Sequence, residues 1–555
     1  MKPIMSDDNM YQYFQEEVKY VFRKICSWEQ PYFYTRFTVE TITDIAKSLS
    51  VLYDSNEVKE EICLIDNALE ILNEFICIEG MENLLVNNYS AIENAIFLEH
   101  SSSGKPRMIR EHYKHQFRNV YLGLVLMEQM GLWEDIEECI SEEANEYSCY
   151  IMDCIRQDIE NSYIVEKKEK EALKEIVYKT YFVAALFHDI GYPLSYYFRV
   201  SDEIQQFTPF FKIISSGIKT EFSEIKALLN NSLLFRTINT TEIKKKYENN
   251  DHGCLSAISF LLNFYFSGSI YSIGQGRKNR CIVEMAAVAI YKHTDKCEDG
   301  KGMLFSQDAI SYLLRICDDM QEWQRFMVLI EDTHNYLMCP DCGKIIAPKG
   351  SDENAYRCDC ESKRDYHKIT KLKNKKLNYI DICDQLELSD EDGRITVKIE
   401  YDYYRQIELL LNNYKGVVYR EKGLKELKAL LENQNGIRQI KIEAFLSNNP
   451  ILLIHKMIEE SEKQEEIVQW LRNMADGNKK DTMQAFYREY EGIFRRYYEK
   501  KEEEKPPIEK PYGEQIEIDV LKYGEKARKY VKKYLGEIYE LWCFLEEKPL
   551  DGKHD

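Results

Sequence analysis

The chain has too few cysteines for a disulfide-dense scaffold, since sixteen thiols are spread over 555 residues. The first residues, from Met1 to Asp8, turn acidic at once and lack the apolar core of a secretory signal. These two absences favour reduced thiols, and we expect a cytoplasmic protein. Positive charge is also scarce, because 74 basic and 95 acidic side chains leave a formal charge of −21. Such a chain repels polyanions, which argues against non-specific binding of DNA or RNA.

Long hydrophobic runs are scarce as well. Only the stretch 253–276 lacks charged residues for long enough to raise the question of a membrane span. Serines, an asparagine and a glycine interrupt it, and it begins beside a candidate metal ligand, His252. We therefore interpret it as a buried core helix and expect no membrane association. The chain is too long for a single core, and it contains no internal repeat.

Histidine is rare, but five of the ten histidines belong to one ordered series. The series starts at His112 and His115, continues with the adjacent pair His188–Asp189, and ends with His252, His293 and Asp318. Such a set can hold two divalent cations in a helical protein, because imidazole nitrogens suit these metals and a carboxylate can bridge them. Adjacent helical residues lie about 100° apart, so His188 can bind one ion while Asp189 bridges both. A single histidine is more often a helix cap or a partner of a buried carbonyl; the ordered set is what indicates metal binding.

In this order the segments resemble the HD-domain superfamily of metal-dependent phosphohydrolases. The similarity covers roughly residues 107–330 and includes Arg110-Glu111-His112 with His115, the stretch from His188 to Pro193, and the stretch from Cys317 to Trp323. It implies an all-helical domain, Mn, Mg, Fe or Zn as metals, and phosphate esters or anhydrides as substrates. By position it implies His115, His188, Asp189 and Asp318 as core ligands, with His188 and Asp189 central to catalysis. His252 and His293 match the extra ligands of two-metal members.

Two of these ligand assignments have a neighbouring alternative. His112 lies one helical turn before His115; similar sequences favour His115 as the ligand and leave His112 to touch the substrate. Asp319 follows Asp318, and we prefer Asp318 because it follows the apolar pair Ile316-Cys317. Charged residues near the ligands are candidates for binding phosphate oxygens, with ordinary salt bridges as the alternative: Lys114, Arg118, Lys292 and Arg325.

A second cluster of potential metal ligands consists of two cysteine pairs, Cys339–Cys342 and Cys358–Cys360. Thiolate pairs at such spacing predict a tetrahedral structural zinc, although the second pair has one intervening residue instead of two or more. Unligated thiols and redox chemistry are the alternatives. The basic segment 363–376 follows, and it could hold a nucleic-acid backbone, a reading that the overall acidity of the chain opposes.

The pattern predicts a mainly α protein with five regions. Alternating apolar residues near Ile395–Tyr401 and Ile440–Ala444 predict strands, which places a small α+β unit after the zinc element. The expected regions are an N-terminal helical part (1–100), an HD-type helical domain (107–335), the Cys-rich zinc element with the basic segment (336–376), the small α+β unit (377–447), and a charged helical tail (448–555) with a linker near 499–511.

We expect the chain to hydrolyse a phosphate ester or anhydride of a small nucleotide with a water activated between two metals. A strongly acidic surface disfavours a polymer, whereas a buried dimetal pocket tolerates a small anion. The alternatives are an HD-type nuclease acting on single-stranded nucleic acid and a non-catalytic nucleotide-sensing protein.

Overall fold

The structure of the chain is a computed structural model. It describes residues 3–26, 55–76, 108–110, 112–141, 146–161, 169–195, 220–266, 275–295, 303–323, 326–338, 345–346, 372–379, 383–391, 394–402 and 440–447, together with a few positions between 78 and 431. The chain divides into two compact units. The helical unit comprises Asp7–Ile380 and Asn435–Ile437, and the sheet unit comprises Met1–Ser6, Asp381–Gln434 and Arg438–Asp555.

The described part of the chain is mostly helical, as the sequence predicts. The helices of the helical unit are α1 (Asp7–Gln12), α2 (Val18–Ile25), α4 (Ser55–Glu70), α6 (His112–Glu128), α7 (Leu132–Ser141), α8 (Glu146–Asn161), α9 (Glu169–Phe187), α12 (Phe222–Leu229), α13 (Leu233–Thr237), α14 (Thr240–Glu248), α15 (His252–Phe266), α16 (Gln275–Lys292) and α17 (Ala309–Met320), with π-helical turns η1 (Tyr13–Glu17) and η2 (Ile71–Ile76).

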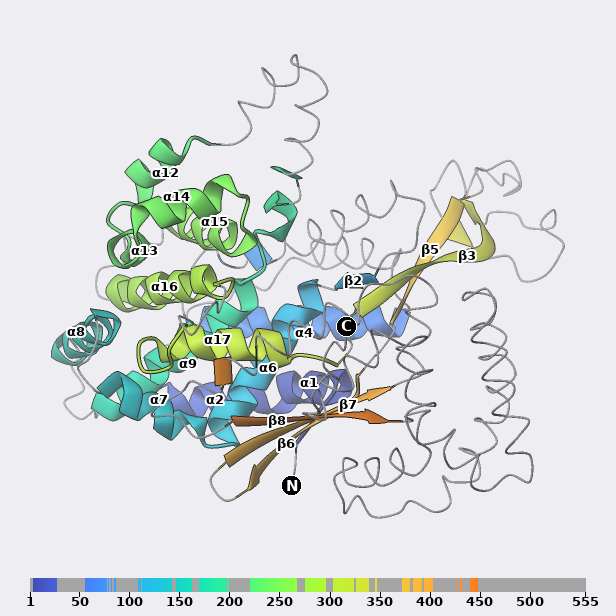
Figure 1. The fold of residues 1–555 in the computed structure, drawn as a ribbon, viewed down its shortest axis with the longest axis horizontal. Coiled ribbons are helices and arrows are strands. Elements are labelled where there is room, and N and C mark those ends of the chain that lie inside the picture. Colours follow the sequence, from blue (N-terminus) through green and yellow to red (C-terminus); the bar gives the residue numbers. More distant parts are fainter. Residues whose placement is uncertain are drawn as a thin grey trace, which may run out of the picture. The chain divides into compact units, whose positions relative to one another are not determined.

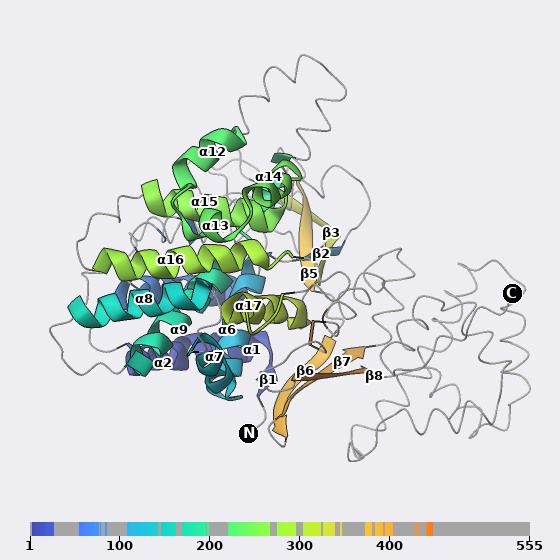
Figure 2. The ribbon, with the colours of Figure 1, turned by 60° about the vertical axis from the view of Figure 1, so that its left-hand side comes forward.

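Helix α9 lies at the centre of this unit. Its side chains are buried without a break from Glu175 to Phe187, which is the pattern of a helix covered on all sides. It packs against α6, α16 and α17, and α16 packs against α15 on its other side. Both ribbon views show α16 lying between α15 and α9 (Figures 1 and 2). The core therefore brings together helices that are far apart in the sequence.

The charge-free stretch 253–276 is helical up to Phe266, and this helix, α15, belongs to the core. Cys254, Leu255, Phe260 and Leu261 are buried in it, in agreement with the core helix that the sequence predicts. No described helix combines the length and apolarity that crossing a membrane requires.

Strands occur at both ends of the segment in which the sequence predicts helices alone. Strand β2 (Met108–Arg110) pairs antiparallel with β3 (Phe326–Met338), and β3 also pairs with β4 (Ile345–Ile346) and β5 (Leu372–Tyr379). The helical expectation for 326–335 was wrong because a short apolar run such as Phe326-Met327-Val328-Leu329-Ile330 does not distinguish helix from strand by periodicity. Its β-branched and aromatic residues favour the strand.

The sheet unit contains four described strands in the order β1-β6-β7-β8. Strand β1 (Ile4–Met5) pairs antiparallel with β6 (Cys383–Glu391), which forms a hairpin with β7 (Arg394–Asp402). Strand β8 (Ile440–Ser447) runs parallel to β7. The two segments with alternating apolar residues are thus β7 and β8, and Ile395, Val397 and Ile399 are buried. Most of the chain between them lies outside the described residues, as do 448–555 and the four cysteines of the zinc prediction.

Candidate metal centre

Five helices of the helical unit bring the predicted ligands together. His115 lies in the first turn of α6, and the pair His188–Asp189 follows the last residue of α9 directly. His252 is the first residue of α15, and His293 follows the end of α16. Asp318 lies in the last turn of α17. Helix ends thus supply most of the site, and their direction brings the side chains into one space.

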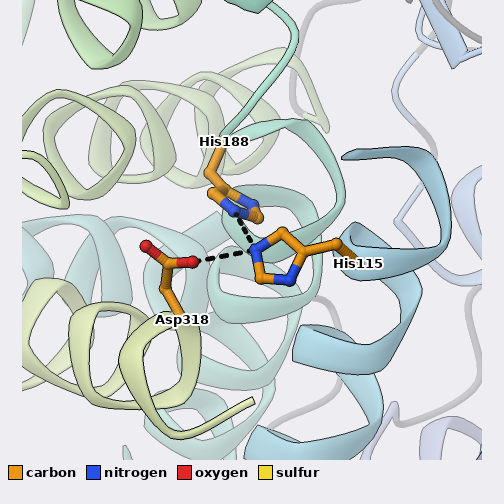
Figure 3. Close-up of side chains that lie close together, drawn as sticks. All are labelled: His115, His188 and Asp318. Carbon is orange, nitrogen blue, oxygen red and sulfur yellow. Dashed lines mark hydrogen bonds and ion pairs between the residues drawn. The ribbon is translucent and has the colours of Figure 1, made fainter. Parts of the chain in front are cut away.

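The first group of ligand atoms centres on His115. Its Nε2 atom lies 2.8 Å from Asp318 Oδ1, 3.2 Å from His188 Nε2 and 3.9 Å from Asp189 Oδ2. Figure 3 shows the ring of His115, from α6, facing both the His188 ring at the end of α9 and the Asp318 carboxylate from α17. His115, His188 and Asp318 are buried and could hold a metal ion.

The second group lies on the other side of Asp189. The Nε2 atoms of His252 and His293 are 3.3 Å apart and lie 3.6 and 3.5 Å from Asp189 Oδ1. Asp189 Oδ2, by contrast, lies 3.5 Å from His188 Nε2. The two oxygens of one carboxylate therefore face two different sets of imidazole nitrogens. His188, Asp189 and His293 form the second buried set that could hold a metal ion.

Hydrogen bonds at Nδ1 turn the Nε2 lone pairs toward the cluster. His188 Nδ1 donates to the Ala185 carbonyl at 2.8 Å, and His293 Nδ1 donates to the Ile290 carbonyl at 2.5 Å. These carbonyls belong to the last turns of α9 and α16, which have no intrahelical partner. His115 Nδ1 lies 2.6 Å from Gln321 Oε1. A ring that donates from Nδ1 keeps its Nε2 lone pair free for a metal.

The contacts between ligand atoms require a proton or a cation. A lone pair on His115 Nε2 and the carboxylate of Asp318 are both acceptors, yet these atoms lie 2.8 Å apart. Ligand atoms at about 2.1 Å from one cation are spaced about 3.0 Å apart in an octahedron and about 3.4 Å in a tetrahedron. The ligand atoms within each group lie 2.8 to 3.6 Å apart, except for His115 Nε2 and Asp189 Oδ2, which are 3.9 Å apart. The donor set and its spacing therefore fit a divalent cation.

Burial sets the protonation of the rings. It lowers the pKa of His188 and of His252, against the charge of Asp189, which acts in the opposite direction. Burial also acts to lower the pKa of His293, but the hydrogen bond and charge of Asp189 outweigh it and leave that pKa raised. His188 and His252 are thereby kept in the neutral form that can ligate a metal.

The site is closed on most sides. The side chains of His115, His188, Asp189 and His293 are at most 1% exposed, whereas those of Asp318 and His252 are 10% and 30% exposed. The His252 ring packs against Tyr192 with 4.6 Å between the ring centroids. Solvent thus reaches the cluster on the side of His252.

A buried network holds His115 in place. Gln321 accepts from His115 Nδ1 and donates to the Trp323 carbonyl at 2.5 Å. The Trp323 indole donates to Asp7 Oδ1 at 3.1 Å. Arg118, which lies on α6 with His115, donates to both oxygens of Asp7 at 2.8 and 2.7 Å. Asp7, the first residue of α1, is thereby linked through Trp323 to Gln321, which accepts a hydrogen bond from the candidate ligand His115.

The geometry separates the two adjacent aspartates. Asp318 faces His115, whereas Asp319 accepts from Arg315 at 2.8 Å. His115 lies in the cluster, and the side chain of His112 lies outside the described residues. The site residue most easily missed is Asn119, whose amide nitrogen lies 3.0 Å from His115 Nε2. Its position one helical turn after His115 is the signal in the sequence.

Of the four candidates for binding phosphate, two form salt bridges, one is buried and one lies outside the described residues. Arg118 is fully buried in its ion pair with Asp7. Lys292 donates to Asp308 at 2.8 Å, and Asp308 raises its pKa although burial acts in the other direction. Lys114 is buried, and Arg325 lies outside the described residues. Arg118 and Lys292 thus form salt bridges, which were the alternative to phosphate binding.

The remaining predicted sites have no described side chains. The four cysteines of the zinc prediction lie outside the described residues, and within the basic segment only the backbone of β5 is described. Comparison of the chain with profiles of known protein families, with curated protein sequences and with solved structures gives no significant match.

Proposed function

We propose that the helical unit is a metal-dependent phosphohydrolase of the HD type, with two divalent cations held by His115, His188, Asp189, His252, His293 and Asp318. The observation that carries this proposal is the position of Asp189. Its two oxygens face separate pairs of nitrogens, His115 with His188 and His252 with His293. A carboxylate in that position suits a bridge between two metals, and Mn, Mg, Fe and Zn all accept such ligands.

When bound, a pair of divalent cations supplies a water of lowered pKa and neutralises charge on a phosphoryl group. The chain contributes the geometry. The four imidazoles and the Asp189 and Asp318 carboxylates would hold the cations, and the two carboxylates would leave part of the metal charge uncompensated. That remaining positive charge favours an anionic substrate. His188 and Asp189, at the junction of both groups, are the residues on which turnover depends most.

The most suitable substrate is a small nucleotide with an ester or anhydride phosphate. The formal charge of −21 repels a polymer of phosphates. Of the six candidate ligands, only His252 and Asp318 have side chains more than 1% exposed, at 30% and 10%, so solvent reaches the cluster mainly at His252. The Tyr192 ring beside His252 gives that side an aromatic surface, on which a nucleobase can stack. A substrate would enter from there with its phosphate toward Asp189.

The test is a substrate panel with the full chain in Mn²⁺ or Mg²⁺. The panel contains deoxynucleoside triphosphates, cyclic nucleotides, guanosine polyphosphates and labelled single-stranded oligonucleotides. We expect turnover of a small nucleotide, abolished by His188→Ala and by Asp189→Ala in proteins that remain folded. Asp319→Asn is the matched control, because its amide keeps an acceptor for Arg315 outside the cluster.

Each other outcome points to a different function. Cleavage of oligonucleotides alone would replace this proposal with the nuclease alternative. Binding of a nucleotide without turnover of any compound would favour the sensor. Full activity in either the His188 or the Asp189 variant would contradict the proposed chemistry.

A further inference from the structure

Asn119 lies inside the first group of candidate ligands although the metal prediction does not include it. It is on α6 one helical turn after His115, so both side chains lie on the same face of the helix. Its side chain is fully buried. The amide nitrogen lies 3.0 Å from His115 Nε2 and 3.3 Å from His188 Nε2.

These distances equal the spacing of the ligand atoms themselves. His115 Nε2 and His188 Nε2 are 3.2 Å apart, so the Asn119 nitrogen forms a nearly equilateral triangle with them. Ligand atoms around one cation at about 2.1 Å have this spacing, about 3.0 Å, at adjacent corners of an octahedron. The end of the Asn119 side chain therefore lies where a further ligand of a cation held by the two imidazoles would lie.

The orientation of the amide fits the cluster without a cation. His188 carries its proton on Nδ1, so its Nε2 lone pair accepts an amide proton of Asn119. Without a cation, the lone pair of His115 Nε2 is already taken by the proton that its 2.8 Å contact with Asp318 requires. The amide oxygen then points away, where it is buried and has no hydrogen-bond partner among the described residues. A buried oxygen without a partner is unfavourable.

A cation reverses this preference. Once the His188 Nε2 lone pair points to a cation, Asn119 loses this acceptor and its amide protons face a positive charge. A rotation of 180° about the Cβ–Cγ bond exchanges the nitrogen with the oxygen and leaves the rest of the side chain in place. The oxygen then occupies the same corner of the polyhedron as a neutral ligand.

We propose that the Asn119 amide oxygen is a ligand of the first metal site, the one at His115 and His188. The amide group rotates by 180° when the cation binds. Amide oxygens suit six-coordinate Mn²⁺ and Mg²⁺ better than tetrahedral Zn²⁺, so Asn119 favours the harder metals. The inference rests on the metal-binding part of the proposed function and is independent of the substrate.

The test is a Mn²⁺ titration by calorimetry of the full chain after removal of metals, with Asn119→Leu as the main variant. Leucine keeps the volume of the side chain and removes both polar atoms. We expect Mn²⁺ binding at one of the two sites to weaken at least about tenfold, with the other site unchanged. Gln116→Leu is the matched control: it is also a buried amide on α6, and we expect it to leave both sites unchanged.

The direction of the change in Mn²⁺ affinity shows whether Asn119 is a metal ligand or only a hydrogen-bond donor to the imidazoles in the metal-free protein. If the amide served only the metal-free state, a cation would have to displace it, and Asn119→Leu would bind Mn²⁺ more tightly. Tighter or unchanged binding overturns the proposal.

Asn119→Asp provides a second test should the leucine variant fail to fold, since it retains a ligand oxygen. We expect it to bind Mn²⁺ at both sites, with the first site at least as tight as in the parent; loss of that site overturns the proposal. A parent that binds no Mn²⁺ contradicts both proposals. A parent that binds two equivalents but turns over no substrate contradicts only the proposed function.

Discussion

At the scale of single residues, the tautomer of each imidazole decides whether the cluster can bind a cation. Backbone carbonyls of the preceding helices set the tautomer of His188 and His293, so these two rings need no second side chain as an acceptor. His115 lies near the start of its helix, where such carbonyls are absent, and Gln321 supplies the acceptor instead. Outer partners of this kind orient the ligand ring and influence metal affinity.

The Gln321→Leu variant should therefore bind metal more weakly. Without the Oε1 acceptor, the His115 ring can rotate or move its proton to Nε2, which removes the lone pair from the cluster. We expect Mn²⁺ affinity at one site to fall about 10- to 100-fold in a calorimetric titration. Gln321→Glu retains an acceptor for Nδ1–H and should keep affinity near that of the parent. Equal affinities in the leucine variant and the parent would contradict this role.

The sequence predicts the six clustered residues from their order and from the rarity of histidine, and these side chains do lie together; metal binding itself stays a prediction. It also prefers Asp318 over Asp319 from the apolar residues before it, and Asp318 is the one that faces His115. Asn119 and Gln321 could not be predicted in this way. A buried amide on an apolar helix has many possible partners, and only distances identify the imidazole.

At the scale of helices, the turn after α9 has to approach α15 closely. A Cβ atom at Gly191 would lie 2.4 Å from the backbone nitrogen of Ser256 and 2.6 Å from the carbonyl oxygen of His252. Gly191 itself donates its N–H to the Ser256 hydroxyl at 2.7 Å. Since these neighbours include backbone atoms, they cannot move aside by rotating a side chain. The glycine thus lets the turn that carries Asp189 contact the helix that carries His252.

Gly191→Ala should move His252 away from Asp189 and so disrupt the second group of ligand atoms. The added methyl group displaces α15, and with it His252, at a loss of about 1–3 kcal/mol in the free energy of unfolding. We expect one of two Mn²⁺ equivalents to be lost, as measured by metal analysis after dialysis.

Gly131→Ala is the control for that variant, because Gly131 has a positive φ of 72° outside the metal cluster. It should lose about 1–2 kcal/mol of stability yet retain the metal content of the parent. If the Gly191 and Gly131 variants bind the same number of ions, the close approach at Gly191 has no bearing on the site.

The helices were easier to predict than the strands. Three-and-four spacing indicates α4, and the burial of α15 follows from its lack of charge. Strand β3 depends on pairing with β2 and β5, which lie more than 200 residues before it and more than 30 residues after it. Such pairing leaves no local pattern, whereas the alternation of β7 and β8 does.

At the scale of the whole molecule, a buried ion pair connects segments far apart along the chain. Asp7 pairs with Arg118, and the Trp323 indole donates to the same carboxylate. Burial alone would raise the pKa of Asp7, but the charge and hydrogen bonds of Arg118 outweigh it and hold the pKa below its usual value of 3.8. The stability that Asp7 provides is therefore present above about pH 4 and is lost as the pH falls through the lowered pKa.

Asp7→Asn should be destabilised most at neutral pH. It leaves the Arg118 guanidinium buried without its counter-charge, which we expect to lower the free energy of unfolding by about 3–5 kcal/mol. Urea unfolding at several pH values should show the difference from the parent narrowing below about pH 4, where Asp7 of the unfolded chain takes up a proton before Asp7 of the folded protein does. Glu248→Gln removes an exposed ion pair with Lys244 and should change stability by less than about 1 kcal/mol. A difference that stays constant with pH would contradict the assignment.

The pairing of β1 with β6 has a consequence for synthesis on the ribosome. Ile4 pairs with Glu387, so translation must add about 380 residues before the partner strand exists. At about 5–20 residues per second this takes roughly 20–75 s. Throughout that interval Met5, which is 2% exposed in the finished sheet, has no sheet to cover it. The nascent chain therefore offers chaperones an apolar strand, and its final sheet closes late in biosynthesis.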